Sequence, residues 1–174
     1  VPGTQTSENN SFLIPCGGAN WRLNERSSLG FVLYGNGGMN TEYDTNIFDS
    51  SLLQFSGVPA GFSSSPLGVN LEQLFIGLNY SYEVNEQLTL GFAPIYALQR
   101  FSATGLELFG PFSSDPANLT NNDDSWSSGW GFNVGLLYEP NEEWDIGISY
   151  RSRVWMSEFD EYSGLFAEQG DFDI

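Results

Sequence analysis

The chain has 174 residues, and its 22 acidic residues against 5 basic ones give a net charge of −17 at pH 7. Such an excess of negative charge excludes a nucleic-acid-binding role, because phosphates would be repelled rather than neutralised. The chain has no histidine and only one cysteine, Cys16, which excludes a histidine base, an intrachain disulfide and a thiolate zinc site, and we expect no enzyme activity, no cofactor and no metal.

Three copies of one short pattern divide the chain. Each has an Asn-Glu pair followed by a glycine six residues after the Asn, and the pairs begin at Asn24, Asn85 and Asn141. Asn tolerates the left-handed backbone region and bonds to its own backbone, so each pair predicts a tight turn between two strands. In chain order, the prediction is a hairpin over 11–38, a long loop over 39–69, a hairpin over 70–106, a loop over 107–125, a hairpin over 126–162 and a final loop over 163–174.

The strand-like runs alternate between apolar residues and small or polar residues. In WDIGISYRSRV, from residue 144 to residue 154, Trp, Ile, Ile and Tyr alternate with Asp, Gly, Ser and Arg, and GWGFNVGLLYE and LFIGLNYSYE show the same period of two. These runs have about the 9–11 residues that a tilted strand needs to cross the hydrocarbon of a membrane. Tyr82, Tyr138 and Trp144 lie next to the short turns, where an interfacial girdle of aromatic residues belongs.

Short turns at one end and long loops at the other are typical of a bacterial outer-membrane barrel. A soluble β-sandwich also alternates with period two, so alternation alone does not separate the two folds. The unequal loops and the aromatic strand ends favour the barrel. We therefore predict an all-β fold, in which residues 1–174 form part of an antiparallel transmembrane β-barrel with six strands in three hairpins.

Three longer stretches extend this interpretation. GWGFNVGLLYEPNEEWDIGISYRSRV places a Gly-Trp-Gly-Phe strand, a short turn and a Tyr-Arg-Ser strand in succession. Upstream, NLEQLFIGLNYSYEVNEQLTLGFAPIYALQRFSATG opens with Asn-Leu-Glu, and SFLIPCGGANWRLNERSSLGFVLYGNGGMNTEY ends in Gly-x-x-Thr-Glu-Tyr. Together, over nearly all of residues 11–162, these stretches resemble the outer-membrane long-chain fatty-acid and hydrocarbon transporter family of the FadL/TodX type.

The resemblance implies a fourteen-stranded barrel plugged by an N-terminal hatch, in which the six strands would be the second to the seventh. Six strands cannot close a barrel, and an open sheet edge cannot face lipid. We therefore expect further strands of a longer protein, or other chains, to complete the barrel.

The resemblance also implies a function, which is passive uptake of hydrophobic small molecules such as long-chain fatty acids or hydrocarbons across the bacterial outer membrane. The expected partners are this substrate, outer-membrane lipid and lipopolysaccharide. Two other functions stay open at this point: a scaffold barrel within a larger outer-membrane assembly, and a soluble acidic β-sandwich that binds ligands at its loops.

A glycine-rich stretch breaks the alternation of the first hairpin at Gly35, Gly37 and Gly38. Glycine inside a strand pattern indicates a bulge or a kink. The resemblance identifies these residues with a kinked strand that opens a lateral gate, through which substrate leaves into the membrane. The alternative is that the strand ends here and the loop begins.

Three arginines are candidate substrate-binding residues. The phase of the last strand places Arg151 and Arg153 on the lumenal face, whereas Arg100 reaches that face only if its strand shifts register by one residue. A guanidinium group could hold a fatty-acid carboxylate by paired hydrogen bonds. The alternative is that these arginines pair with lumenal acids such as Asp145 and Glu139 and stiffen the barrel.

Apolar residues also occur in the polar loop over 107–125, notably Leu108, Phe109 and Phe112. The resemblance implies that such outer loops form an apolar groove that first captures the substrate. The alternative is that these side chains pack the loop down. The acidic residues of the long loops could bind Ca²⁺, although a solvated acidic surface is the simpler interpretation.

Overall fold

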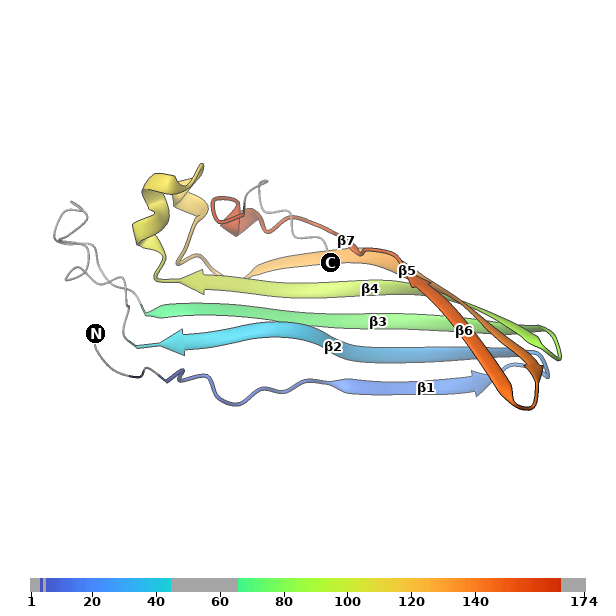
Figure 1. The fold of residues 1–174 in the computed structure, drawn as a ribbon. Coiled ribbons are helices and arrows are strands. Elements are labelled where there is room, and N and C mark those ends of the chain that lie inside the picture. The colour runs from blue at the N-terminus through green and yellow to red at the C-terminus, as the bar shows by residue number, and fades with distance from the viewer. Residues whose placement is uncertain (1–3, 5, 45–65, 167–174) are drawn as a thin grey trace.

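The computed structural model describes residue 4, residues 6–44 and residues 66–166. These residues form one antiparallel sheet whose long strands lie side by side in chain order (Figure 1). The strands are β1 (Cys16–Arg22), β2 (Ser27–Tyr43), β3 (Leu67–Asn85), β4 (Leu88–Thr104), β5 (Ser125–Asn141), β6 (Trp144–Arg151) and β7 (Trp155–Met156). The all-β, antiparallel prediction is confirmed, with one strand more than predicted, because the short β7 pairs with β5 after β6 has ended.

The Asn-Glu repeats form the three short turns at one end of the sheet (Figure 1). In each turn the Asn side-chain oxygen accepts a hydrogen bond from the backbone N–H two residues further on. The N···O distances are 2.9 Å from Arg26 to Asn24, 2.9 Å from Gln87 to Asn85 and 3.0 Å from Glu143 to Asn141. Asn is therefore used in all three copies because its side chain closes the turn on the backbone.

At the other end of the sheet, the loop between β4 and β5 carries the short 3₁₀ helices η2 (Glu107–Phe112) and η3 (Pro116–Asn118). A third, η4 (Asp160–Tyr162), follows β7. The predicted loops over 39–69 and 163–174 lie largely outside the described residues. Of the first loop, the residues up to Tyr43 belong to β2 and those from Leu67 belong to β3.

The strand register gives the sheet two chemically different faces. We call one the outer face, because it carries the alternating apolar set and exposes it: all five tryptophans lie there, with between 47% and 64% of their surface exposed. Directly opposed residues form apolar rows across the strands. One such row runs through Trp21, Leu29, Tyr80, Phe92, Val134 and Tyr150. An unpartnered apolar surface of this kind suits contact with lipid tails rather than water.

The opposite, inner face changes character along the strands. Near the short turns it carries small and polar residues such as Asn79, Ser81 and Gly135. Toward the long loops it becomes apolar and is covered by the segment 152–166, which we call the covering segment. Phe159 and Tyr162 of this segment are fully buried against Leu71 and Phe101. The apolar core of the described chain therefore lies on the inner face, under the covering segment.

The sheet is not closed, because its order runs from β1 to β6 and the two end strands do not pair with each other. Figure 1 shows β6 turning away from the plane of the long strands, so the sheet curves at that side. Among the described residues, no helix is long and apolar enough to span a membrane.

Candidate functional site

Arg151 ends β6 and points to the inner face, directly opposite Asn133 of β5. Its guanidinium carbon lies 5.0 Å from the centre of the Phe75 ring, which belongs to β3. Among the described residues, no carboxylate forms an ion pair with Arg151, since both ion pairs found there belong to Arg100. Arg151 therefore lies on the face that the alternation assigns to it, and the alternative pairing with Asp145 or a similar acid is not found among the described residues.

The surroundings of Arg151 are apolar. Phe75, Ile95, Ala97 and Val154 form a buried cluster with between 0% and 3% of their surface exposed. Tyr34 packs against this cluster and stacks on Phe75 with ring centres 5.6 Å apart. The inner face thus brings a positive charge next to an aromatic ring and an aliphatic surface, a combination that fits a molecule with an acidic head and an apolar tail.

Arg153 does not share the face of Arg151, and the prediction that it does is wrong. The pairing with β5 shifts by one residue between Arg151 and β7, which moves every later side chain to the other face. Trp155 is paired with the outer-face Trp130, and the Arg153 guanidinium lies 5.5 Å from the centre of the Trp155 ring.

Ser152 causes this shift. Its hydroxyl oxygen accepts a hydrogen bond from the backbone N–H of Phe132 at 2.9 Å, and its own N–H donates to the Phe132 carbonyl at 2.9 Å. A side-chain oxygen therefore takes the place of a backbone acceptor, and the regular ladder of β6 ends. Gly131 makes room for the crossing, because a Cβ at that position would lie 3.0 Å from Val154 Cγ2 and 3.1 Å from the Arg153 carbonyl oxygen.

Arg100 lies on the outer face, because neither β3 nor β5 shifts register against β4 at this point. The register shift that would turn Arg100 toward the lumen therefore does not occur. Its guanidinium binds Glu72 at 2.9 Å and Asp124 at 3.2 Å, and lies 5.9 Å from the centre of the Trp126 ring. These contacts fix Arg100 away from Arg151, on the opposite side of the sheet.

The glycine-rich stretch contains a β-bulge, since the register of β2 against β3 shifts between Gly35 and Gly37. The strand continues past the bulge to Tyr43, so the alternative that it ends here is wrong. Gly37 has a φ of +158°. A Cβ on Gly38 would lie only 2.6 Å from the carbonyl oxygen of Leu71 on β3, so the close approach of the two backbones requires glycine there.

The ladder between β1 and β2 ends beside this bulge. Its first pair is Cys16 with Tyr34, and one further hydrogen bond of 3.0 Å joins the Gly35 N–H to the Pro15 carbonyl. Ile14 lies so close that a Cβ on Gly35 would be 2.9 Å from its Cγ2 atom. Within the described chain, the part of β2 beyond the bulge has no regular strand partner on this side. Residues 7–9 contact it only at its end, where the Glu8 N–H donates to the Glu42 carbonyl at 2.8 Å and Asn9 Nδ2 donates to Asn40 Oδ1 at 2.7 Å.

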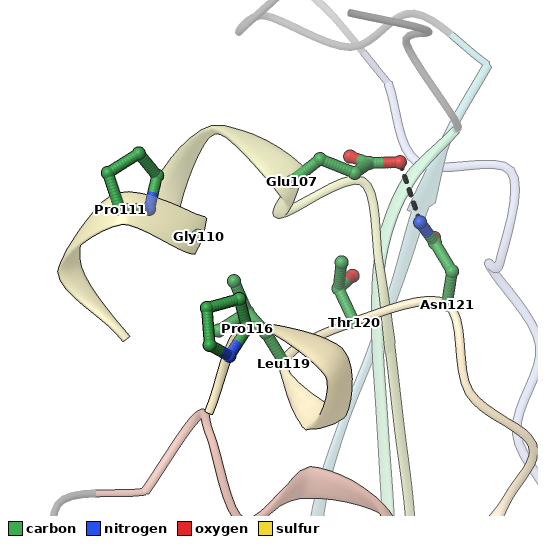
Figure 2. A pocket seen from close by; sticks show the side chains of 7 residues that line it. All are labelled: Glu107, Gly110, Pro111, Pro116, Leu119, Thr120 and Asn121. Atoms are coloured by element: carbon green, nitrogen blue, oxygen red, sulfur yellow. Dashed lines mark hydrogen bonds between the residues drawn. The ribbon is translucent and has the colours of Figure 1, made fainter. Parts of the chain in front are cut away.

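The loop after β4 forms a solvent-open pocket of about 390 Å³ between η2 and η3 (Figure 2). It is lined by Glu107, Gly110, Pro111, Pro116, Leu119, Thr120 and Asn121. Figure 2 shows the hydrogen bond that closes one side of it, from Asn121 Nδ2 to Glu107 Oε1 at 2.6 Å. The predicted groove residues of this loop do not line the pocket: Leu108 is half-buried, Phe109 is 39% exposed and Phe112 is 87% exposed.

Asp115 joins this loop to the covering segment. Its Oδ2 atom accepts hydrogen bonds from Asn118 Nδ2 at 2.7 Å and from Ser163 Oγ at 3.1 Å. The hydrogen bond from Asn118 is the main cause that lowers the pKa of the Asp115 carboxyl below its ordinary value. Asp115 is one of several such connections, since Ser113 Oγ also donates to the Gly164 carbonyl at 2.6 Å and the Gly164 N–H donates to the Asn118 carbonyl at 2.9 Å.

The sequence alone missed two glutamines on the inner face. Gln73 and Gln99 are opposite each other on β3 and β4 and lie between the two apolar clusters. The signal that would have found them is the phase of β4: Ala93, Ile95 and Ala97 share the face of Gln99, so a polar amide falls within an apolar row.

The chain is similar to known outer-membrane proteins in both sequence and fold. A family model described as outer membrane protein transport protein (OMPP1/FadL/TodX) matches residues 2–170. The fold is similar to that of a FadL homologue from Pseudomonas aeruginosa, with 15% sequence identity and a TM-score of 0.55. That similarity covers 88% of this chain and 37% of the other, so the chain spans little more than a third of that protein. No curated protein matches the chain.

The sequence prediction of the family and of its location is therefore confirmed, and the soluble sandwich is excluded. The family consists of transport proteins rather than enzymes. The match over nearly the whole sequence, together with a FadL-like open sheet whose outer face is apolar, shows that this chain belongs to the OMPP1/FadL/TodX family of outer-membrane transport proteins.

Proposed function

We propose that the complete protein passes hydrophobic small molecules with a carboxylate head, such as long-chain fatty acids, across the outer membrane without an energy source. The observation that carries this proposal is the Arg151 guanidinium on the inner face, 5.0 Å from the Phe75 ring centre and without an ion-pair partner among the described residues. In a chain with 22 acidic residues, an unpaired guanidinium beside an apolar cluster is a local site for an anion with an apolar tail.

Each part of such a substrate has a counterpart on the inner face. The carboxylate binds Arg151 through paired hydrogen bonds, which a planar guanidinium group offers at a fixed spacing. The alkyl tail packs against the partly buried residues at the border of this cluster, Tyr34 and Met156, where each buried CH₂ group contributes about 0.8 kcal/mol. The outer face meanwhile rests against lipid tails.

The bulge of β2 is the exit in this proposal. Its support is the register shift between Gly35 and Gly37 and the absence of a β1 partner for the part of β2 that follows. A molecule that leaves the inner face at this edge reaches the lipid directly, so its tail never crosses water.

Uptake of labelled oleate into liposomes that contain the complete protein tests the proposal. Arg151→Gln removes the charge on the inner face, and we expect oleate affinity to fall about 10- to 100-fold, the range for a lost hydrogen bond between charged groups. Arg153→Gln is the matched control, because it removes the same charge two residues away on the outer face. Equal uptake by the wild type and by the Arg151 variant would refute the role of Arg151.

A scaffold barrel is the competing function. It requires that the complete protein give no more uptake than empty liposomes, whatever residue stands at position 151. The same assay therefore decides between the two functions, since the scaffold gives no protein-dependent signal at all.

A further inference from the structure

A polar row crosses the inner face between its two apolar clusters. Gln73 of β3, Gln99 of β4 and Ser127 of β5 are directly opposed. On one side lies the cluster around Phe75, and on the other the cluster around Phe101. Polar side chains are thus placed in the middle of a surface that is otherwise built to hold apolar groups.

The central residue of this row is fully buried. Gln99 has 0% of its surface exposed and Ser127 has 2%. The covering segment lies above them: Val154 belongs to the cluster on one side and Phe159 to the cluster on the other. A molecule that reaches Gln99 must therefore enter between the sheet and the covering segment.

The hydrogen bonds of this row leave the amide nitrogen of Gln99 without an acceptor among the described residues. Gln73 Nε2 donates to Gln99 Oε1 at 2.9 Å, and Ser127 Oγ donates to the carbonyl of Ser157 at 2.5 Å. Gln99 Nε2 is buried and has no hydrogen-bond partner among the residues that the structure describes. A buried donor without an acceptor costs about 1–3 kcal/mol. A ligand that places an oxygen within hydrogen-bond distance of Gln99 Nε2 removes this cost and binds more tightly by a similar free energy.

We propose that Gln99 is a head-group binding residue, whose Nε2 donates a hydrogen bond to an oxygen of the cargo. The cargo is then an amphiphile with an oxygen acceptor, charged or neutral, and not a bare hydrocarbon. This inference rests on the proposed function, because it places the same apolar tail on the same inner face. It adds a second polar contact: Arg151 recognises negative charge, whereas Gln99 recognises an acceptor whether or not it is charged.

Three ligands with the same sixteen-carbon chain separate these contacts: palmitate, which is charged, methyl palmitate, which has only neutral acceptors, and hexadecane, which has neither. Binding of each tritiated ligand to the complete protein in detergent is compared for the wild type and for Gln99→Met, which keeps the length of the side chain and removes the donor. We expect about fivefold weaker binding of methyl palmitate, the effect of one neutral hydrogen bond, and about 10- to 100-fold weaker binding of palmitate, whose carboxylate forms a charge-assisted hydrogen bond. Binding of hexadecane should be unchanged.

Two controls keep the test decisive. Gln87→Met makes the same chemical change in an exposed turn, where Gln87 Nε2 donates to the Pro140 carbonyl, and should leave all three affinities unchanged. Gln99→Leu is a second variant in case the first fails to fold, and heat-modified migration on a gel reports the folded barrel for both.

The outcomes are distinct. If Gln99→Met leaves methyl palmitate binding unchanged, or weakens hexadecane to the same extent, the inference is wrong, because the amide then serves packing or an ordered water. If Arg151→Gln has no effect on palmitate while Gln99→Met weakens it, the proposed role of Arg151 fails and the role of Gln99 stands. The reverse pattern refutes Gln99 alone.

Discussion

Phe159 holds the covering segment on the inner face, so its truncation to alanine should release that segment. The side chain is fully buried, and its ring centre lies 5.4 Å from that of Phe101 and 5.8 Å from that of Phe166. Truncation of a buried phenylalanine costs about 3–5 kcal/mol, the lost transfer free energy together with the cavity left behind. Because 1.4 kcal/mol is a factor of ten, Phe159→Ala should raise the open population of the segment roughly 100- to 4,000-fold.

Hydrogen exchange followed by mass spectrometry measures this opening directly. The peptide to follow contains the Tyr162 amide, whose N–H donates to the Phe159 carbonyl at 2.9 Å. Phe112→Ala is the matched control, because that side chain is 87% exposed and its loss should change exchange at Tyr162 by less than twofold. If both variants exchange at the wild-type rate, the covering segment is not held by Phe159 and the burial of the inner face has another cause.

Two further predictions concern the strand bulge and the loops. Gly38→Ala should destabilise the folded protein by about 1–3 kcal/mol, because the new Cβ would lie 2.6 Å from the Leu71 carbonyl oxygen and the two backbones must separate. Urea titration measures this loss, and an unchanged midpoint of unfolding would contradict the close approach of the two strands. The lowered pKa of Asp115 means that its carboxylate stabilises the loops above the ordinary pKa, and that this contribution is lost as pH falls through the lowered value. Limited proteolysis of the loop at Ser163 should therefore be faster at acid pH than at neutral pH in the wild type. The Asp115→Asn variant should be cleaved at the same rate at acid and neutral pH, and this rate should equal that of the wild type at acid pH.

The period-two pattern and the turn chemistry predict most of this fold. Each turn needs only local groups, an Asn side chain and an N–H two residues away, so Asn24, Asn85 and Asn141 could be identified from the sequence. The face of Arg151 follows in the same way, since the alternation in β6 is regular up to its last residue.

The side chains that the sequence did not place depend on non-local contacts. Arg153 changes face because the Ser152 hydroxyl meets the backbone of Phe132, twenty residues earlier, and a shift of one residue reverses every later side chain. The position of the covering segment depends on Phe101 and Leu71, which are distant in sequence from Phe159. No local pattern carries that information.

The Gly-Trp-Gly stretch shows how a motif gains its physical meaning only from the structure. Gly129 and Gly131 lie on the inner face, where the chain from Arg153 to Met156 runs antiparallel to β5 at close distance. A Cβ on Gly129 would overlap the Trp155 carbonyl oxygen, and one on Gly131 would crowd Val154. Both glycines are therefore required by the close approach of two backbones, which the sequence pattern alone does not indicate.

The proposed transport function depends on the difference between the two faces of the sheet, and neighbouring residues of β3 test this difference most directly. Leu78 lies on the outer face and is 50% exposed, and Asn79 lies on the inner face. Spin labels placed singly at these positions, in the complete protein reconstituted in lipid with Cys16 replaced by serine, report collisions with oxygen, which enters hydrocarbon, and with a water-soluble nickel complex. We expect the label at 78 to favour oxygen and the label at 79 to favour nickel; equal access of nickel to both would contradict a lipid-facing outer face and an enclosed inner one.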